Sequence, residues 1–268
     1  MDGTVLDGAD ARVSVFDRGF TVGDGVFETL VVHDGRPFAL GRHLARFHAS
    51  ARGLDLEVPV GDDELRRAVA AVVAAGRGAV GRVRLTLTGG PAPSGGARRG
   101  PPTLVVTGEP ASPWPATARV ATVPWPRNER SPTAGLKTTS YADNGCALRA
   151  AHARGADEAL VPNTVGMLCE GTSSNVFVVL GGRLVTPPLS AGCLPGVTRA
   201  LVLEVTGAEE ADVPMAALAE VAEAFLTSTT RGVQPVARLD DRALPAPGPL
   251  TAAARAAFEE LVRTTIDP

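Results

Sequence analysis

The chain has 268 residues, 44% of them hydrophobic and 21% charged, with a formal net charge of −3. This length suits one large domain or two smaller ones with a buried core, and the composition is that of an ordinary soluble globular protein. No basic tail is present and only 4% of residues are aromatic, so nucleic acid is not an expected partner. No window approaches the ~18 uninterrupted apolar residues of a membrane span, and residues 1–15 lack the pattern of a signal peptide. We therefore expect a cytoplasmic protein with no membrane partner.

The cysteines and histidines indicate neither a disulfide framework nor a metal site. The cysteines are odd in number and widely spaced, as reduced thiols are, and the histidines show no metal-ligand spacing. These residues are Cys146, Cys169 and Cys193, and His33, His43, His48 and His152.

Strands dominate the elements predicted for the first half of the chain. Residues 12–19 alternate apolar and polar positions, as a strand does, and residues 25–40 predict two strands joined at Asp34-Gly35, a strong hairpin signal. The Gly/Pro-rich segment 89–102 is expected to be a mobile loop. The remaining predictions are helices over 41–54 and 62–76, strands over 81–90 and 103–107, and a linker over 108–117.

Strands and helices are mixed in the second half, and no internal repeat is evident. Consecutive strands followed by such a mixture favour an α+β fold in two lobes over a regular doubly wound sheet. The predicted strands cover 118–125, 157–163, 174–187 and 223–239, and the predicted helices cover 141–155, 195–207 and 249–264.

Lys137 is the only lysine among 26 Lys and Arg residues, and it lies in GLKTTSYADN (135–144) beside the only tyrosine, Tyr141. A coding bias toward arginine could leave one lysine by chance. Alternatively, this position needs chemistry that arginine cannot perform, because a desolvated lysine amine can lose its proton and act as a nucleophile.

Three further segments combine with this lysine. Glu170, in CEGTSSNVF, is either a loop acid before a tight turn or the carboxylate partner of a heterocyclic nitrogen. LPGVTR (194–199) and STTRG (228–232) offer small residues, hydroxyls and backbone N–H groups that suit a phosphate. A lone lysine, a downstream carboxylate and two phosphate-type loops are the parts that pyridoxal 5′-phosphate (PLP) requires, so the set predicts PLP as the cofactor.

The chain resembles the fold-type IV PLP enzymes, the aminotransferase class IV group, and looks closest to the aminodeoxychorismate lyases. The resemblance implies an α+β fold of the D-amino-acid aminotransferase-like type, with a small N-terminal α/β domain (1–110), a linker (111–117) and a larger PLP-binding domain (118–268). It further implies PLP in the interdomain cleft of a homodimer. Seven motifs carry it in family order: DRGFTVGDGVFETL, HLARF (an H-x-x-R pattern), GLKTTSYADN, DEALVPN, EGTSSNVF, LPGVTR and AFLTSTTRGVQPV.

The resemblance also implies a role for each matching residue. Lys137 would form the Schiff base and move the proton, and Glu170 would pair with the pyridinium nitrogen. Tyr141 would lie near the phenolic oxygen of the cofactor. The phosphate would be held by Arg46, by the backbone of Val197 and Thr198, and by Thr229.

The implied activity is that of an aminodeoxychorismate lyase, which converts 4-amino-4-deoxychorismate to 4-aminobenzoate and pyruvate in folate biosynthesis. The alternative is a class IV aminotransferase of the D-amino-acid or branched-chain type. Phe27 stands where a D-amino-acid aminotransferase has a tyrosine, and the Arg-x-His clamp of those enzymes has no clear counterpart in residues 86–100. The RG-x-G-x-RG loop of the lyases is only loosely echoed there. Candidates for binding a dicarboxylate substrate are Arg98, Arg99, Arg127 and Arg231.

Two other classes of protein remain for comparison. A non-enzymatic α+β binding protein, with a lysine left by coding bias, would be colourless. A nucleotide-binding oxidoreductase is disfavoured, because no G-x-G-x-x-G lies between a predicted strand and a predicted helix.

Overall fold

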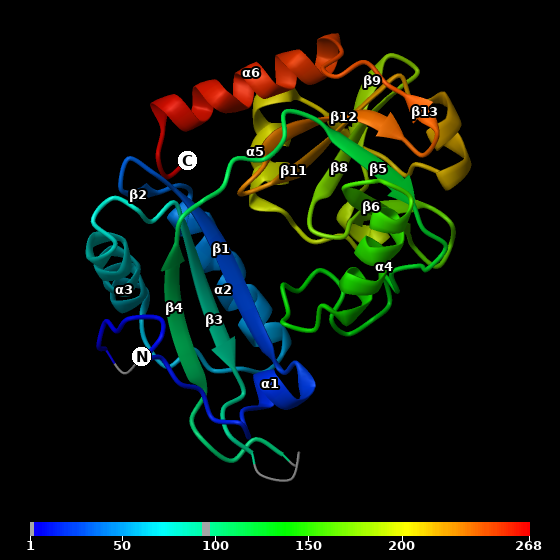
Figure 1. Cartoon of the computed structure of the whole chain (residues 1–268). Coiled ribbons are helices and arrows are strands. Elements are labelled where there is room, and N and C mark those ends of the chain that lie inside the picture. The colour runs from blue at the N-terminus through cyan, green and yellow to red at the C-terminus, as the bar shows by residue number, and fades with distance from the viewer. Residues whose placement is uncertain (1–2, 93–96) are drawn as a thin grey trace. The chain divides into compact units, whose positions relative to one another are not determined.

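The computed structural model describes residues 3–92 and 97–268 (Figure 1). Contacts divide the chain into two compact units. The first unit comprises Met1–Ser112, Leu136–Tyr141 and Ile266–Pro268, and the second comprises Pro113–Gly135 and Ala142–Thr265. The division after Ser112 falls inside the segment predicted as a linker. The two short segments that rejoin the first unit differ from the predicted boundaries, which assign them to the C-terminal domain.

The first unit contains a four-stranded antiparallel sheet in the order β2-β1-β3-β4 (Figure 1). The predicted hairpin is confirmed, because His33 pairs with Arg36 across Asp34 and Gly35, whose φ angles are 49° and 73°. The strands are β1 (Gly25–His33), β2 (Arg36–Pro37), β3 (Arg82–Thr88) and β4 (Thr103–Glu109), and the helices are α1 (Arg18–Val22), α2 (Leu40–Gly53) and α3 (Asp62–Ala75).

The predicted strand over 12–19 is wrong. Residues 12–16, all of them described, form no strand, and α1 begins at Arg18. The Asp17 side chain accepts a hydrogen bond from Gly19 N and thereby caps the helix, so the capping residue outweighs the alternating pattern. The predicted mobile loop over 89–102 includes residues 93–96, which lie outside the described residues.

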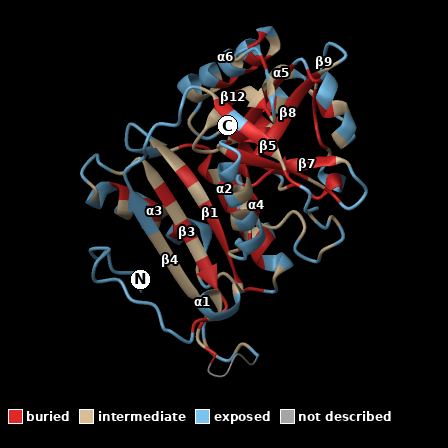
Figure 2. Ribbon diagram, turned by 45° about the vertical axis from the view of Figure 1, so that its right-hand side comes forward, coloured by how far each residue is buried: buried red, intermediate tan, exposed pale blue. Residues whose placement is uncertain are grey.

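One face of the four-stranded sheet packs against α2 and α3. Val83, Leu85 and Leu87 of β3 are fully buried there, and the residues between them are half-buried on the opposite face (Figure 2). Helical spacing brings Leu44, Phe47 and Ala51 of α2 and Leu65, Val69 and Val73 of α3 into the same core.

The N-terminus of α2 receives partners from a remote part of the chain. Ala39 N donates to Ile266 O at 2.8 Å, and Gly41 N donates to Asp267 Oδ1 at 2.8 Å across 226 positions. Since α2 has no side-chain cap of its own, these residues satisfy N–H groups that the helix cannot pair internally.

The second unit contains a nine-stranded mixed sheet in the order β10-β9-β8-β11-β12-β5-β6-β7, with β13 paired to β12. The strands are β5 (Ala118–Thr122), β6 (Glu158–Pro162), β7 (Leu168–Gly171), β8 (Asn175–Leu180), β9 (Arg183–Thr186), β10 (Glu209–Glu210), β11 (Glu223–Ser228), β12 (Gly232–Leu239) and β13 (Arg242–Ala243). The helices are α4 (Ala142–Ala153), α5 (Val197–Thr206) and α6 (Pro249–Thr264), with short 3-10 helices η2 (Leu189–Ala191) and η3 (Met215–Glu220).

The central strands of this sheet are buried nearly throughout, which explains their continuous apolar runs (Figure 2). Phe177 of β8 and Phe225 of β11 are partners in register, and their rings stack with centroids 4.8 Å apart. The helices α5 and α6 pack on β11, and α4 packs on β5 and β6. The α+β fold predicted from the sequence is therefore confirmed.

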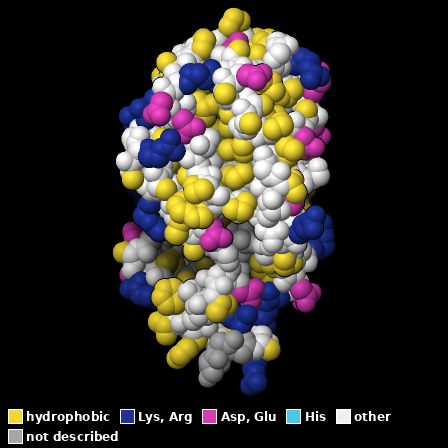
Figure 3. Space-filling model, turned by 90° about the vertical axis from the view of Figure 1, so that its right-hand side faces the viewer, with side chains coloured by type: hydrophobic (Ala, Val, Ile, Leu, Met, Phe, Trp, Pro, Cys, Tyr) yellow, Lys and Arg dark blue, Asp and Glu magenta, His cyan; other side chains and the backbone are white. Residues whose placement is uncertain are grey.

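Hydrophobic and charged side chains are interspersed on the face drawn in Figure 3. Elsewhere in the chain, exposed large hydrophobic residues follow one another between Val13 and Val22, where Phe20 is 78% exposed and Val15 is 68% exposed. No helix within the described residues is long and apolar enough to cross a membrane.

Candidate active site

Lys137 lies on a short segment that is held along the beginning of β1. Phe27 N donates to Lys137 O at 3.0 Å, and Thr139 N donates to Gly25 O at 2.8 Å, as in an antiparallel pair. Lys137 N in turn donates to the Ser50 hydroxyl of α2 at 3.1 Å. The lysine side chain therefore starts from a backbone that is fixed by a strand and by a helix.

The ring of Phe27 is the centre of a cluster within the first unit. Lys137 Nζ lies 4.3 Å from the ring centroid and the Arg84 guanidinium carbon lies 3.7 Å from it. Tyr141 meets the same ring edge-on, with centroids 5.4 Å apart. Cations are attracted to the negative face of an aromatic ring, so the Phe27 ring contacts both of them. The single lysine and the single tyrosine of the chain are thus brought to one residue.

Arg84 is a functional candidate that the sequence-based predictions omit. Burial lowers the pKa of Arg84, so its charge is partly desolvated. Within the described part of the chain its guanidinium donates to Thr86 Oγ1 at 3.2 Å and forms no ion pair. A partly desolvated guanidinium of this kind is suited to binding a carboxylate.

Arg46, the predicted phosphate ligand, is bound to Glu28 of β1. Its Nε and Nη2 donate to the two carboxylate oxygens at 2.7 and 2.8 Å, and His43 Nδ1 lies 2.7 Å from the second oxygen. Burial by itself would raise the pKa of Glu28, but Arg46 and His43 lower it to about 2. Burial also lowers the pKa of His43. The H-x-x-R spacing places both side chains on one face of α2, and both reach the same buried carboxylate.

Glu170 lies on strand β7 in the second unit and is buried, which differs from the alternative of a loop acid. Arg127 Nε lies 3.0 Å from one carboxylate oxygen of Glu170, and Leu194 N donates to the other at 2.9 Å. Asn175 donates to Leu194 O at 2.9 Å and joins the two segments. The orientation of the Glu170 carboxylate is therefore set from both sides.

The N-terminus of α5 has the features of a phosphate site. Gly196 is its N-cap residue and no side chain caps the helix, so the N–H groups of Val197 and Thr198 are suited to binding an anion. The nearby hydroxyls of Ser174 and Thr227 are buried and have no hydrogen-bond partner within the described residues. A Cβ added to Gly196 would come within 2.0 Å of Asn175 Oδ1, so a larger residue here requires the Asn175 side chain to move.

The predicted site residues fall into two sets, each described within its own unit. The first unit holds Lys137, Tyr141 and Arg46, and the second holds Glu170, Val197, Thr198 and Thr229. An amine, an oriented carboxylate and an uncapped helix start with unpaired hydroxyls nearby are groups that fit PLP.

Three arginines considered as ligands of a dicarboxylate substrate pair with carboxylates of the chain itself. Arg127 pairs with Glu170, Arg98 with Asp24 and Arg231 with Glu158. No group of three or more His, Cys, Asp or Glu residues that could hold a metal ion occurs within residues 3–92 and 97–268.

The two-sheet fold is that of the fold-type IV PLP enzymes. The profile of the amino-transferase class IV family matches residues 25–239, and the chain belongs to that family.

Similar proteins include both transferases and lyases. A Methanocaldococcus jannaschii protein, provisionally named a branched-chain-amino-acid aminotransferase, is 32% identical over 91% of this chain and 88% of its own length. The aminodeoxychorismate lyase of Bacillus subtilis is 27% identical over 90% of this chain and 86% of its own. The PLP-bound structure of a Mycobacterium tuberculosis hypothetical aminotransferase is 29% identical, covers 96% of this chain and 95% of its own, and superposes with a TM-score of 0.84. The family uses PLP as its cofactor, as predicted.

Proposed function

We propose that this protein is a PLP-dependent lyase that converts 4-amino-4-deoxychorismate to 4-aminobenzoate and pyruvate. The observation that carries the proposal is the pair of cations on the ring of Phe27, with Lys137 Nζ at 4.3 Å and Arg84 at 3.7 Å from its centroid. One cation is the candidate nucleophile and the other is a candidate ligand for a substrate carboxylate. The similarity to the Bacillus subtilis lyase supports the choice of reaction.

The roles of the residues follow from their contacts. PLP, when bound, withdraws electrons from the carbon that carries the substrate amine. Lys137 would hold the cofactor through Nζ, and the same amine would move the proton of that carbon. Glu170, oriented by Arg127 and by Leu194 N, keeps the proton on the pyridine nitrogen. Arg84 binds a substrate carboxylate and orients the substrate beside Lys137.

The phosphate of PLP is assigned to the N-terminus of α5, with Thr229 and Arg46 as further ligands. Because Arg46 is engaged by Glu28, it contributes a guanidinium whose position is already fixed before the anion arrives. Tyr141, in contact with Phe27, is proposed to lie near the phenolic oxygen of the cofactor.

The test is to incubate the protein, loaded with PLP, with 4-amino-4-deoxychorismate and to measure 4-aminobenzoate and pyruvate. We expect both products in equal amounts, and we expect Lys137→Ala to lose the reaction together with the borohydride-sensitive visible absorbance. Arg84→Lys keeps the charge but loses the planar fork, so KM should rise more than kcat falls. A wild-type protein that binds PLP but forms no 4-aminobenzoate contradicts the lyase assignment.

A class IV transaminase is the second candidate, because the Methanocaldococcus jannaschii protein provisionally named a branched-chain-amino-acid aminotransferase is 32% identical to this chain. It would use the same residues and return the proton to the cofactor instead of releasing pyruvate. Turnover of D-alanine or a branched-chain amino acid with 2-oxoglutarate, without any 4-aminobenzoate, would identify it.

We also propose a homodimer. The exposed apolar residues between Val13 and Val22 form the kind of surface that is covered by a partner in an assembled protein. A second copy of the chain is the partner proposed here.

A further inference from the structure

Glu158 of β6 gathers polar groups from two separate turns of the second unit. Its carboxylate is fully buried and accepts hydrogen bonds from Ser173 N at 2.7 Å, from Ser173 Oγ and from Thr172 Oγ1. These two residues follow Glu170 by two and three positions. The carboxylate also accepts from Arg231, which lies in the same turn as Thr229. One buried acid therefore ties the segment after Glu170 to the segment after Thr229.

Arg231 extends this connection. Its side chain is 3% exposed, and besides Glu158 it donates to Ser173 Oγ at 3.1 Å and to Gln234 Oε1 at 3.0 Å. A guanidinium with several donors in a fixed plane can hold such a set of acceptors, whereas a lysine ammonium holds them less rigidly.

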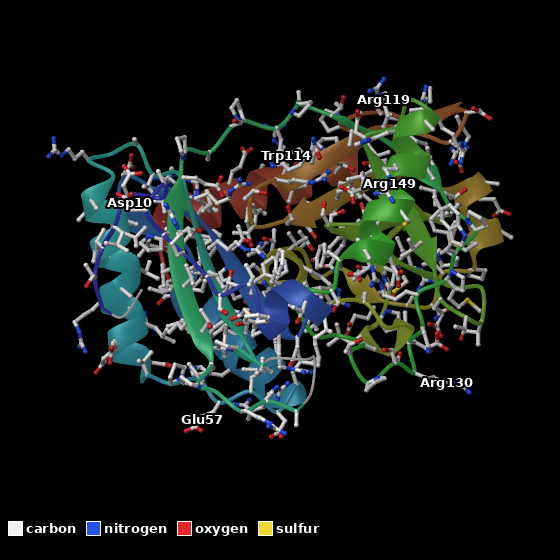
Figure 4. All side chains as sticks on the ribbon, turned by 60° about the horizontal axis from the view of Figure 1, so that its bottom comes forward. Asp10, Glu57, Trp114, Arg119, Arg130 and Arg149 are labelled. Carbon is white, nitrogen blue, oxygen red and sulfur yellow. The ribbon has the colours of Figure 1, made fainter. Side chains whose placement is uncertain are left out.

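Trp114, which is labelled in Figure 4, stacks its ring on the Arg231 guanidinium. The Arg231 guanidinium carbon lies 3.9 Å from the centroid of the Trp114 ring, and Trp114 Nε1 donates to Thr230 Oγ1 at 3.2 Å. Gln234 donates to Pro115 O at 2.8 Å and fixes the same segment. Of the two residues after Thr229, Thr230 is thus held by the Trp114 indole, and Arg231 is held by the Glu158 carboxylate and by the same indole.

We propose that Arg231 and Trp114 are positioning residues that set the span between the two ends of the bound cofactor. Glu170 is assigned to the pyridine nitrogen and Thr229 to the phosphate, and Glu158 with Arg231 fixes the distance between the segments that carry them. This inference rests on the proposed binding of PLP. Neither residue touches the reacting atoms, so both act through the Thr229 turn.

The test compares PLP with pyridoxal, which lacks the phosphate, in Arg231→Lys and Trp114→Phe. We expect Arg231→Lys to raise the Kd for PLP roughly tenfold, as for a lost charge-assisted hydrogen bond, and Trp114→Phe to raise it about threefold. The Kd for pyridoxal should change less than about twofold in both, because the nitrogen end of the site is intact. Arg242→Lys is the control, since Arg242 donates only to the carbonyls of Leu218 and Val221 in the described structure.

Equal weakening of PLP and pyridoxal, or no weakening of either, overturns the positioning role. If the wild-type protein binds neither compound, the proposed function itself fails. In that case the positioning role is decided on the cofactor-free protein by hydrogen exchange of the amides of residues 228–231. Faster exchange in Arg231→Lys than in wild type and Arg242→Lys supports the positioning role, and unchanged exchange overturns it.

Discussion

Glu28 is a charged residue at a core position of β1. Residues Val26 and Leu30, two positions away on either side, are fully buried and belong to the apolar core, and Glu28 is equally buried. The buried carboxylate is tolerated because Arg46 and His43 pair with it. A carboxylate at a position of an alternating strand that faces the apolar core therefore indicates, from the sequence alone, that the acid has a buried partner. Arg84 gave no such signal, because an arginine on the half-exposed phase of a strand is ordinary.

The depressed pKa of Glu28 predicts a specific acid sensitivity. Its pKa falls from 4.5 to about 2 on folding, so the ionised carboxylate stabilises the fold above pH 4.5 and this contribution is lost as the pH falls toward 2. This difference in pKa corresponds to roughly 3 kcal/mol of unfolding free energy. Glu28→Gln should be destabilised at pH 7, and the difference in unfolding free energy between wild type and variant should shrink as the pH approaches 2.

Urea unfolding at a series of pH values measures this difference. Glu57→Gln is the control, because Glu57 is exposed (Figure 4) and should leave a constant difference from wild type. A constant difference between wild type and Glu28→Gln across the same range would contradict the assigned ion pair.

At the scale of elements, the start of α5 depends on the close approach of two segments. Gly196 has an extended backbone with φ −63° and ψ 133°, which any residue adopts, so its role is steric and not conformational. An added methyl group would meet Asn175 Oδ1 at 2.0 Å, and Asn175 connects Leu194 to the neighbourhood of Glu170. The uncapped helix start and the carboxylate on β7 are therefore packed through one side chain.

Gly196→Ala should disturb both the start of α5 and the position of the Glu170 carboxylate. We expect a loss of about 1–3 kcal/mol of stability from overpacking, and weaker binding of PLP. Gly61→Ala is a matched control, because Gly61 is also an N-cap glycine without a side-chain cap, at α3, and an added Cβ would meet nothing within 4 Å. Thermal unfolding and PLP titration of both variants measure the effect. Equal behaviour of the two variants would show that the contact with Asn175 is easily relieved.

The elements that could be predicted are those with a hydrophobic pattern that repeats over many residues, or with a strong turn signal. The hairpin at Asp34-Gly35 and the helices α2, α3, α5 and α6 are of this kind. β7 was missed because four residues carry too little periodicity, and α1 because the cap at Asp17 lay inside an alternating pattern. The site residues Lys137 and Glu170 came from the combination of motifs. Their partners Phe27, Arg84 and Arg127 depend on strand register and tertiary contacts, which no local pattern encodes.

At the scale of the whole molecule, the proposed homodimer gives a direct prediction. Replacing Phe20, which is 78% exposed, by Asp places a charge in the apolar N-terminal segment and should weaken self-association at least about tenfold. Light scattering coupled to size exclusion, over a range of concentrations, measures the association. Leu189→Asp changes an exposed leucine of the second unit and serves as the control. A monomeric wild-type protein would contradict the dimer.

The partners of the α2 N-terminus also bear on synthesis and folding. This helix carries His43 and Arg46 and supports Lys137 through Ser50, yet Ile266 and Asp267 pair with its first N–H groups. Residues 40–53 leave the ribosome more than two hundred positions before those partners do. During that interval the first sheet can form, but the first N–H groups of α2 lack their partners. Lys137 is synthesised about ninety residues after Ser50, to which it donates. The first unit is therefore completed after most of the second has been made, and ribosome-bound chains ending before residue 266 should expose α2 to proteases.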